Sequence, residues 1–111
     1  MQPNPRLADL VDANMAALGL EVQRPAPNER MGSTDIGNVS QAVPALHPYV
    51  AIGPEDLAGH TIEFRAAACS PAGYQAMQHA AQFMAMTAID LLAVPENMEA
   101  VKEAFGLGPS F

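Results

Sequence analysis

The sequence contains little cysteine, few basic residues and no long uninterrupted apolar run. Its single cysteine, Cys69, excludes an intrachain disulfide and a zinc knuckle built from several cysteines. Five Lys and Arg stand against twelve Asp and Glu, and the resulting net charge of -7 disfavours binding to nucleic acid or to an anionic membrane surface. The first ten residues lack the basic and apolar regions of a secretory signal, and the apolar stretches elsewhere are too short to span a membrane. We therefore expect a cytoplasmic protein that binds neither nucleic acid nor membrane.

The 111 residues are enough for one small domain and leave no room for a second independent core. A first helix is predicted to begin at Pro5 and to stop at Gly19, because Asn4 is a good N-cap and glycine suits the left-handed stop. A long helix over residues 71–93 is predicted to follow the N-cap Ser70. A further short helix is expected to start at Pro95, with Gly106 at its stop.

Apolar residues of the long helix recur at intervals of three and four, which predicts that this helix packs through one side. This apolar stripe consists of Tyr74, Met77, Ala81, Met84, Ala88 and Leu91. The opposite side, expected to be solvated, carries Gln75, Gln78, His79, Gln82 and Asp90. Met86 lies off the stripe and indicates that a second face of the helix is also covered.

Short segments between the helices alternate apolar and polar residues, as half-buried strands do. They are Leu20–Gln23, Tyr49–Ile52 and Thr61–Phe64, although Pro44 and Pro48 remove donors just before the second segment. The order of helix, three strands and two helices predicts an α/β fold. The expected architecture is a partial three-layer sandwich in which short strands pack against helices.

Small residues cluster at Gly32–Asn38, where backbone N–H groups are able to approach an anionic ligand. The cluster is not a phosphate loop, because a Walker motif requires lysine where Asn38 stands. Spacing alone favours a simpler interpretation, an ordinary turn followed by a helix that Thr34 or Asp35 caps.

Three histidines are the other candidates for chemistry, and spacing alone assigns a ligand role to none of them. His60 follows Gly59 at the edge of a predicted strand, where an imidazole is able to reach a metal or a substrate. Zinc needs three or four protein donors, however, and the sequence has no closely spaced histidine or cysteine pair. His47 and His79 are therefore interpreted as ordinary surface or core residues, and Cys69 has no adjacent base that would make it a nucleophile.

Two segments together resemble a known enzyme family: GSTDIGNVSQAVPALHPYVAIG at 32–53 and GHTIEFRAAA at 59–68. They are similar to the C-terminal part of the catalytic domain in metal-dependent amidohydrolases and metallopeptidases of the aminoacylase and glutamate-carboxypeptidase type. The resemblance is nearest to the branch that includes aminobenzoyl-glutamate hydrolases. Enzymes of this family hydrolyse N-acyl amino acids or peptide-like amide bonds with one or two divalent metal ions, usually zinc or manganese.

The resemblance implies roles for individual residues. His60 matches the C-terminal metal-ligand histidine of the family, and Gly32, Ser33, Thr34 and Asp35 match a loop that lines the substrate cleft. His47 has a motif position without an assigned role, and Ile62 stands where relatives commonly have proline. No residue of this chain is assigned a catalytic role, because the sequence contains no Glu-Glu pair to supply the family's general base.

The resemblance thus implies that residues 1–111 form a single partial domain without the family's N-terminal half or its inserted dimerisation domain. We expect such a chain to bind metal weakly or not at all, and to be inactive unless the missing half of the enzyme completes it. The alternative is a non-catalytic binding or oligomerisation module derived from the same fold, which binds another chain or a second copy of itself.

Overall fold

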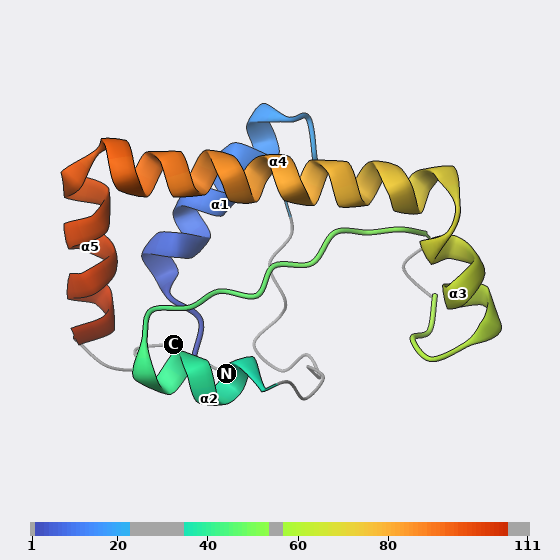
Figure 1. Ribbon diagram of the computed structural model, residues 1–111, viewed down its shortest axis with the longest axis horizontal. Helices are drawn as coiled ribbons and strands as arrows, with labels where there is room; N and C mark the ends of the chain where they lie inside the picture. The colour runs from blue at the N-terminus through green and yellow to red at the C-terminus, as the bar shows by residue number, and fades with distance from the viewer. Residues whose placement is uncertain (1, 23–34, 54–56, 107–111) are drawn as a thin grey trace.

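The computed structural model describes residues 2–22, 35–53 and 57–106, and these residues form five helices (Figure 1). The helices are α1 (Pro5–Ala17), α2 (Ile36–Ala42), α3 (Ile62–Ala68), α4 (Pro71–Ala93) and α5 (Pro95–Gly106). The long α4 spans the molecule, with α3 at its N-terminal end and α5 turning away from its C-terminal end (Figure 1). Helix α1 packs against both α4 and α5.

Both ends of α1 are fixed by the residues that the sequence indicated. The Asn4 side chain accepts hydrogen bonds from the backbone N–H groups of Arg6 and Leu7, at 3.0 and 3.1 Å. At the other end Gly19 has φ of +82°, a left-handed conformation that glycine adopts without strain. The N–H of Leu20 then bonds to the carbonyl of Met15 at 3.0 Å, which closes a Schellman motif. The predicted first helix is confirmed.

The core lies where α1 crosses α4, and it is small. Val11 and Met15 of α1 meet Phe83 of α4, whose side chain is 1% exposed. Partly buried side chains surround this cluster: Leu18, Leu20, Val22, Leu46, Val50 and Ala80. Aromatic and aliphatic side chains buried in this way supply most of the stability of a small helical domain.

A buried amide connects α5 to the start of α1. Asn4 caps α1 with its Oδ1, and its Nδ2 donates to the backbone carbonyl of Val101 at 3.0 Å. Val101 is itself buried. The two residues are 97 positions apart, so this hydrogen bond joins the two ends of the described chain.

The structure corrects the predicted α/β fold, because the described residues form helices and no strand. The clearest reversal is Thr61–Phe64, which starts α3 instead of forming a strand. The Thr61 hydroxyl accepts the N–H of Phe64 at 3.1 Å, and the alanines that follow have the highest helix propensity. The local capping signal therefore outweighs the alternation of apolar and polar residues over these four positions.

The other two expected strands are wrong for a different reason. Tyr49–Ile52 lies in a non-helical segment that runs beneath α4 toward α3, with no described strand to pair with it (Figure 1). Leu20 and Val22 pack on the core without forming a ladder, and Gln23 lies outside the described residues. Because a strand requires a neighbouring strand for its backbone hydrogen bonds, alternation alone produces none here.

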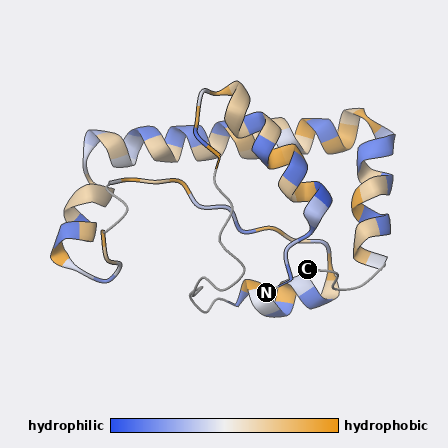
Figure 2. Cartoon of the chain, turned by 180° about the vertical axis from the view of Figure 1, so that it is seen from behind, coloured by the Kyte–Doolittle hydropathy of each residue, from blue (hydrophilic) through white to orange (hydrophobic). Residues whose placement is uncertain are grey.

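The buried face of α4 is also not the one that the sequence predicted. Its buried residues are Gly73, Ala76, Phe83 and Thr87, whereas most of the apolar stripe is exposed. Met77 and Met84 of that stripe are 63% and 56% exposed. Figure 2 shows apolar residues recurring along the whole length of α4. Within the described ranges, no helix combines the length and apolarity needed to cross a membrane.

Candidate functional site

His60 occupies the most unusual backbone position in the described chain. It has φ of +60°, and no other non-glycine residue described by the structure has a positive φ. The left-handed region costs a residue with a side chain about 1 kcal/mol or more. Strain of this kind is retained where the surrounding structure imposes it, and it is concentrated at functional sites.

The turn that holds His60 is built by the residue after it. Thr61 donates from its hydroxyl to the carbonyl of Ala58 at 2.7 Å and accepts from the N–H of Phe64 at 3.1 Å. These two bonds fix residues 58–61 onto the first turn of α3. The His60 side chain lies exposed at the corner of this turn. Its imidazole is therefore free to meet a ligand and does not contribute to the core.

The loop expected to line the cleft is described only at its last residue. Gly32, Ser33 and Thr34 lie outside the described residues. Asp35 is exposed at the N-cap position of α2, where its side chain makes no capping hydrogen bond. The helix expected after this turn is confirmed, but the capping role considered for the Asp35 side chain is not.

The structure does not bring the candidate ligands together. Asp35 precedes α2 and His60 precedes α3, and these two helices lie in separate parts of the molecule (Figure 1). Among the described residues, no group of three or more His, Cys, Asp or Glu side chains is placed to hold a metal ion. A catalytic zinc site needs three protein ligands. The described residues therefore do not form such a site, and a metal bound at His60 requires ligands from elsewhere.

The remaining candidates lie in ordinary surroundings. His47 is exposed and its ring stacks on Tyr49, with ring centroids 4.8 Å apart and an interplanar angle of 29°. His79, expected to be solvated, is half-buried on α4. Cys69 is exposed at the C-terminal end of α3. None of these three residues is shown as a nucleophile hydrogen-bonded to a neighbouring base.

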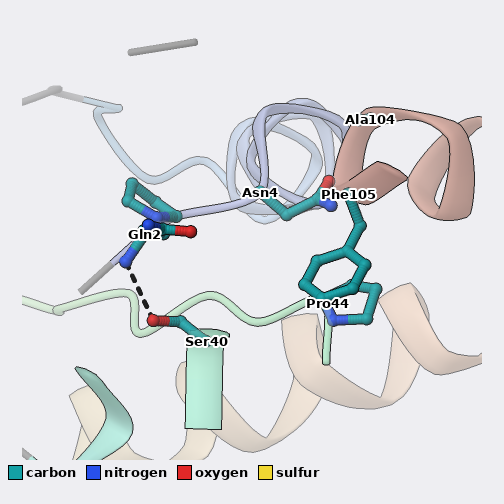
Figure 3. Close-up of a pocket in the computed structure, with 7 residues that line it drawn as sticks. Gln2, Asn4, Ser40, Pro44, Ala104 and Phe105 are labelled. Carbon is teal, nitrogen blue, oxygen red and sulfur yellow. Dashed lines mark hydrogen bonds between the residues drawn. The ribbon is translucent and has the colours of Figure 1, made fainter. Parts of the chain in front are cut away.

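A small hollow between the N-terminus, α2 and α5 is too small for a substrate. Its volume of about 20 Å³ is enough for about one water molecule. Figure 3 shows Phe105 lying against Pro44 and the backbone N–H of Gln2 bonding to the Ser40 hydroxyl, at 2.9 Å. Ser40 in turn donates to the carbonyl of Gly37 at 2.8 Å. These groups satisfy one another, so the hollow has a structural role.

A buried polar network that the sequence patterns did not indicate joins α1 and α4. Asn14 donates from Nδ2 to Oγ1 of Thr87 at 3.0 Å and to Oδ2 of Asp90 at 2.9 Å. The backbone carbonyl of Asp90 accepts from Nδ2 of Asn97 at 3.0 Å. The available signal was Asn14 itself, a polar residue on the apolar side of the first helix between Val11 and Met15. This network positions helices and has no exposed reactive group.

Comparison with known proteins connects the chain to peptidases. Over nearly its whole length it is similar to part of a dipeptidase from each of two mammals. The first is the Xaa-Arg dipeptidase of Mus musculus, 38% identical over 105 residues, which cover 93% of this chain and 24% of the relative. The second is the Xaa-Arg dipeptidase of Homo sapiens, 38% identical over 107 residues, which cover 95% of this chain and 24% of the relative.

The chain thus spans about a quarter of the length of the curated relatives it matches. No family model matches it, and no solved structure matches it. The similarity supports the expected relationship to peptidases. The aminobenzoyl-glutamate hydrolase branch is not named by these relatives and stays a prediction.

Proposed function

We propose that this chain is one segment of a metal-dependent peptidase or amidohydrolase, in which His60 supplies one ligand to a divalent metal ion. The similarity to Xaa-Arg dipeptidases over 93% and 95% of the chain supports the peptidase class. The resemblance of the GHTIEFRAAA segment to a metal-ligand motif supports the role of His60. Residues 1–111 are then a partial domain of the complete enzyme.

The observation that carries the proposal is the conformation of His60. A histidine at φ of +60° with an exposed side chain is costly for the fold, and its imidazole contributes nothing to the core. A glycine at this position would form the same turn with less strain. We therefore infer that the exposed imidazole binds a ligand, and imidazole is the commonest metal ligand in proteins.

The substrate is an amide bond of the peptide type, and the loop Gly32, Ser33, Thr34 and Asp35 lines its cleft. The names of the two relatives make a dipeptide with C-terminal arginine the first substrate to test. The metal is zinc or manganese. Its other ligands and the general base come from the part of the enzyme outside this segment, because the described residues contain no ligand cluster.

The first experiment measures hydrolysis by the isolated chain. Purified protein is incubated with a dipeptide ending in arginine, with N-acyl amino acids and with aminobenzoyl-glutamate, in the presence of zinc or manganese. We expect no turnover, since one histidine does not hold a catalytic metal. Metal-dependent turnover by the chain alone would contradict it.

The second experiment measures metal binding by calorimetric titration of zinc. The wild type is expected to bind weakly, and His60→Ala is expected to remove that binding. His79→Ala is the matched control, since His79 lies within α4 and not in the turn before α3 that holds His60. Submicromolar affinity in the wild type would reveal a complete site, and unchanged binding in His60→Ala would exclude His60 as the ligand.

A second candidate function is a non-catalytic binding or oligomerisation module. The observation that favours it is the exposed apolar stripe of α4, which includes Met77 and Met84. Light scattering across micromolar concentrations distinguishes a module that forms oligomers from one that binds a different chain. A mass that stays at 11.7 kDa excludes oligomerisation of the isolated chain.

A further inference from the structure

Helix α4 has two apolar faces, and the described structure covers one of them. Ala76, Phe83 and Thr87 face α1 and are buried. The apolar stripe lies about 100° further around the helix, since each of its members follows the buried positions by about one residue. Tyr74 is 56% exposed, and Leu92, beside the end of the stripe, is 81% exposed.

The exposed side of α4 carries no charge. Asp90 is the one residue of the Asp, Glu, Lys and Arg class in the 23 residues of α4, and its carboxylate bonds to Asn14 on the covered side. Surface helices of folded domains carry charged residues on their solvent face, whereas the exposed polar residues of α4 outside the stripe are uncharged glutamines. Methionine and tyrosine are also typical of interface cores. The apolar stripe therefore has the composition of a buried surface.

We infer that the apolar stripe of α4 docks against the part of the peptidase that lies outside this segment, a partner with an uncharged apolar surface. This inference rests on the proposed function. The curated relatives contain the matching segment within chains about four times as long, since it covers 24% of each. The corresponding remainder of the peptidase is the partner that we propose for the apolar stripe. It is either part of the same chain or a separate chain.

Two other occupants fit less well. A second copy of the chain brings two net charges of -7 together, which opposes association. A membrane surface favours helices with lysine or arginine beside the apolar face, and α4 has neither. The small side chains of Ala81 and Ala88 within the stripe instead permit close approach of a packed protein surface.

The test compares thiol accessibility in two contexts. In the first, the isolated chain carries Cys69→Ser with either Met84→Cys or Gln82→Cys. In the second, the same variants replace the matching segment of the mouse Xaa-Arg dipeptidase, which gives a fusion of full peptidase length. Alkylation rates at each site are read by mass spectrometry. Gln82 is the matched control, because it is exposed on α4 outside the apolar stripe.

Position 84 is expected to react freely in the isolated chain and at least about tenfold more slowly in the folded fusion. Position 82 is expected to react at similar rates in both. Equal reactivity of position 84 in the two contexts would overturn the inference. Concentration-dependent protection in the isolated chain would also overturn it, because a second copy would then be the occupant.

Binding of separate pieces gives a second measurement if the fusion does not fold. The mouse relative without the matching segment is titrated with the wild-type chain, with Met84→Glu and with Gln82→Glu. Met84→Glu is expected to weaken binding at least about tenfold and Gln82→Glu to leave it within about twofold. Equal binding by all three, or no binding by the wild type, would overturn the inference. None of these readouts depends on activity, so an inactive fusion with a protected position 84 would contradict the proposed function alone.

Discussion

The side chain of Asn14 in α1 donates a hydrogen bond to the Thr87 hydroxyl in α4, 3.0 Å away and 73 residues along the chain. The same amide donates to Asp90, and Thr87 donates to the carbonyl of Phe83 at 2.7 Å. Both Asn14 and Thr87 are buried. These bonds lie on the same face of α4 as the buried Phe83, and together with its packing they hold α1 against that face.

Replacing Asn14 by alanine should lower the free energy of unfolding by about 1–3 kcal/mol, because Asp90 and Thr87 lose a buried donor. Urea denaturation measures the change. Gln78→Ala on the exposed side of α4 is the control and should change stability by no more than about 0.5 kcal/mol. Equal effects of the two substitutions would show that the buried amide does not fix the helix pair.

Neighbouring residues of α4 should differ sharply in their contribution to stability. Phe83→Ala removes the most buried side chain of the core and should cost about 3–5 kcal/mol. Met84→Ala should cost less than about 1 kcal/mol in the isolated chain, since this side chain is 56% exposed. Thermal unfolding of both variants measures the difference. A larger loss for Met84→Ala would reverse the assignment of the covered face.

Gly73 should resist a substitution that usually stabilises helices. A Cβ at this position would lie 2.5 Å from the carbonyl oxygens of Ala67 and Ala68, which form the end of α3. Gly73→Ala should therefore lower stability by about 1–3 kcal/mol despite the higher helix propensity of alanine. Gly106→Ala meets no neighbouring atom within 4 Å and should be neutral or slightly stabilising. A stabilised Gly73→Ala protein would contradict the tight junction of α3 and α4.

The backbone of His60 predicts a substitution that separates stability from function. His60→Gly should raise the free energy of unfolding by about 0.5–1 kcal/mol, because glycine accepts φ of +60° without steric cost. The same variant should lose whatever zinc binding the wild type has. Denaturation and calorimetry on one preparation test both expectations. Loss of stability in His60→Gly would mean that the imidazole supports the fold.

Helix ends could be predicted from the sequence because their signals are local. Asn4 caps the start of α1 and Gly19 ends it, as the capping patterns indicated. Ser70 likewise caps the start of α4 by accepting the N–H of Gly73 at 3.2 Å. A cap depends on three or four neighbouring residues, all of which the sequence displays. The boundaries of α1 and α4 needed no knowledge of the remaining chain.

Strands and packing faces could not be predicted, because they depend on distant partners. Tyr49–Ile52 alternates like a strand, but its alternation does not reveal whether another strand lies beside it. Helix α4 has two apolar faces, and periodicity marked the one that α1 does not cover. The two faces are distinguished by contacts from distant α1: Val11 and Met15 pack on Phe83, and Asn14 bonds to Thr87 across 73 residues.

The sequence was enough to name the candidate site residues, but it did not show how these residues lie relative to one another. His60 was identified by its resemblance to a metal-ligand motif, and its strained backbone was not visible in the sequence. Asp35 was identified within a loop of which only this last residue is described. Because ligands converge through tertiary structure, spacing along the chain does not decide which donors meet, and the described residues hold no cluster of three or more.

The most direct test of the proposed function places this chain within a complete enzyme. In the fusion that replaces the matching segment of the mouse Xaa-Arg dipeptidase, bound metal and hydrolysis of a dipeptide ending in arginine are measured together for wild type, His60→Ala and His79→Ala. We expect the wild-type and His79→Ala fusions to retain metal and activity, and His60→Ala to lose both. A folded His60→Ala fusion with the metal content and activity of the wild type would contradict the role of His60 as a metal ligand.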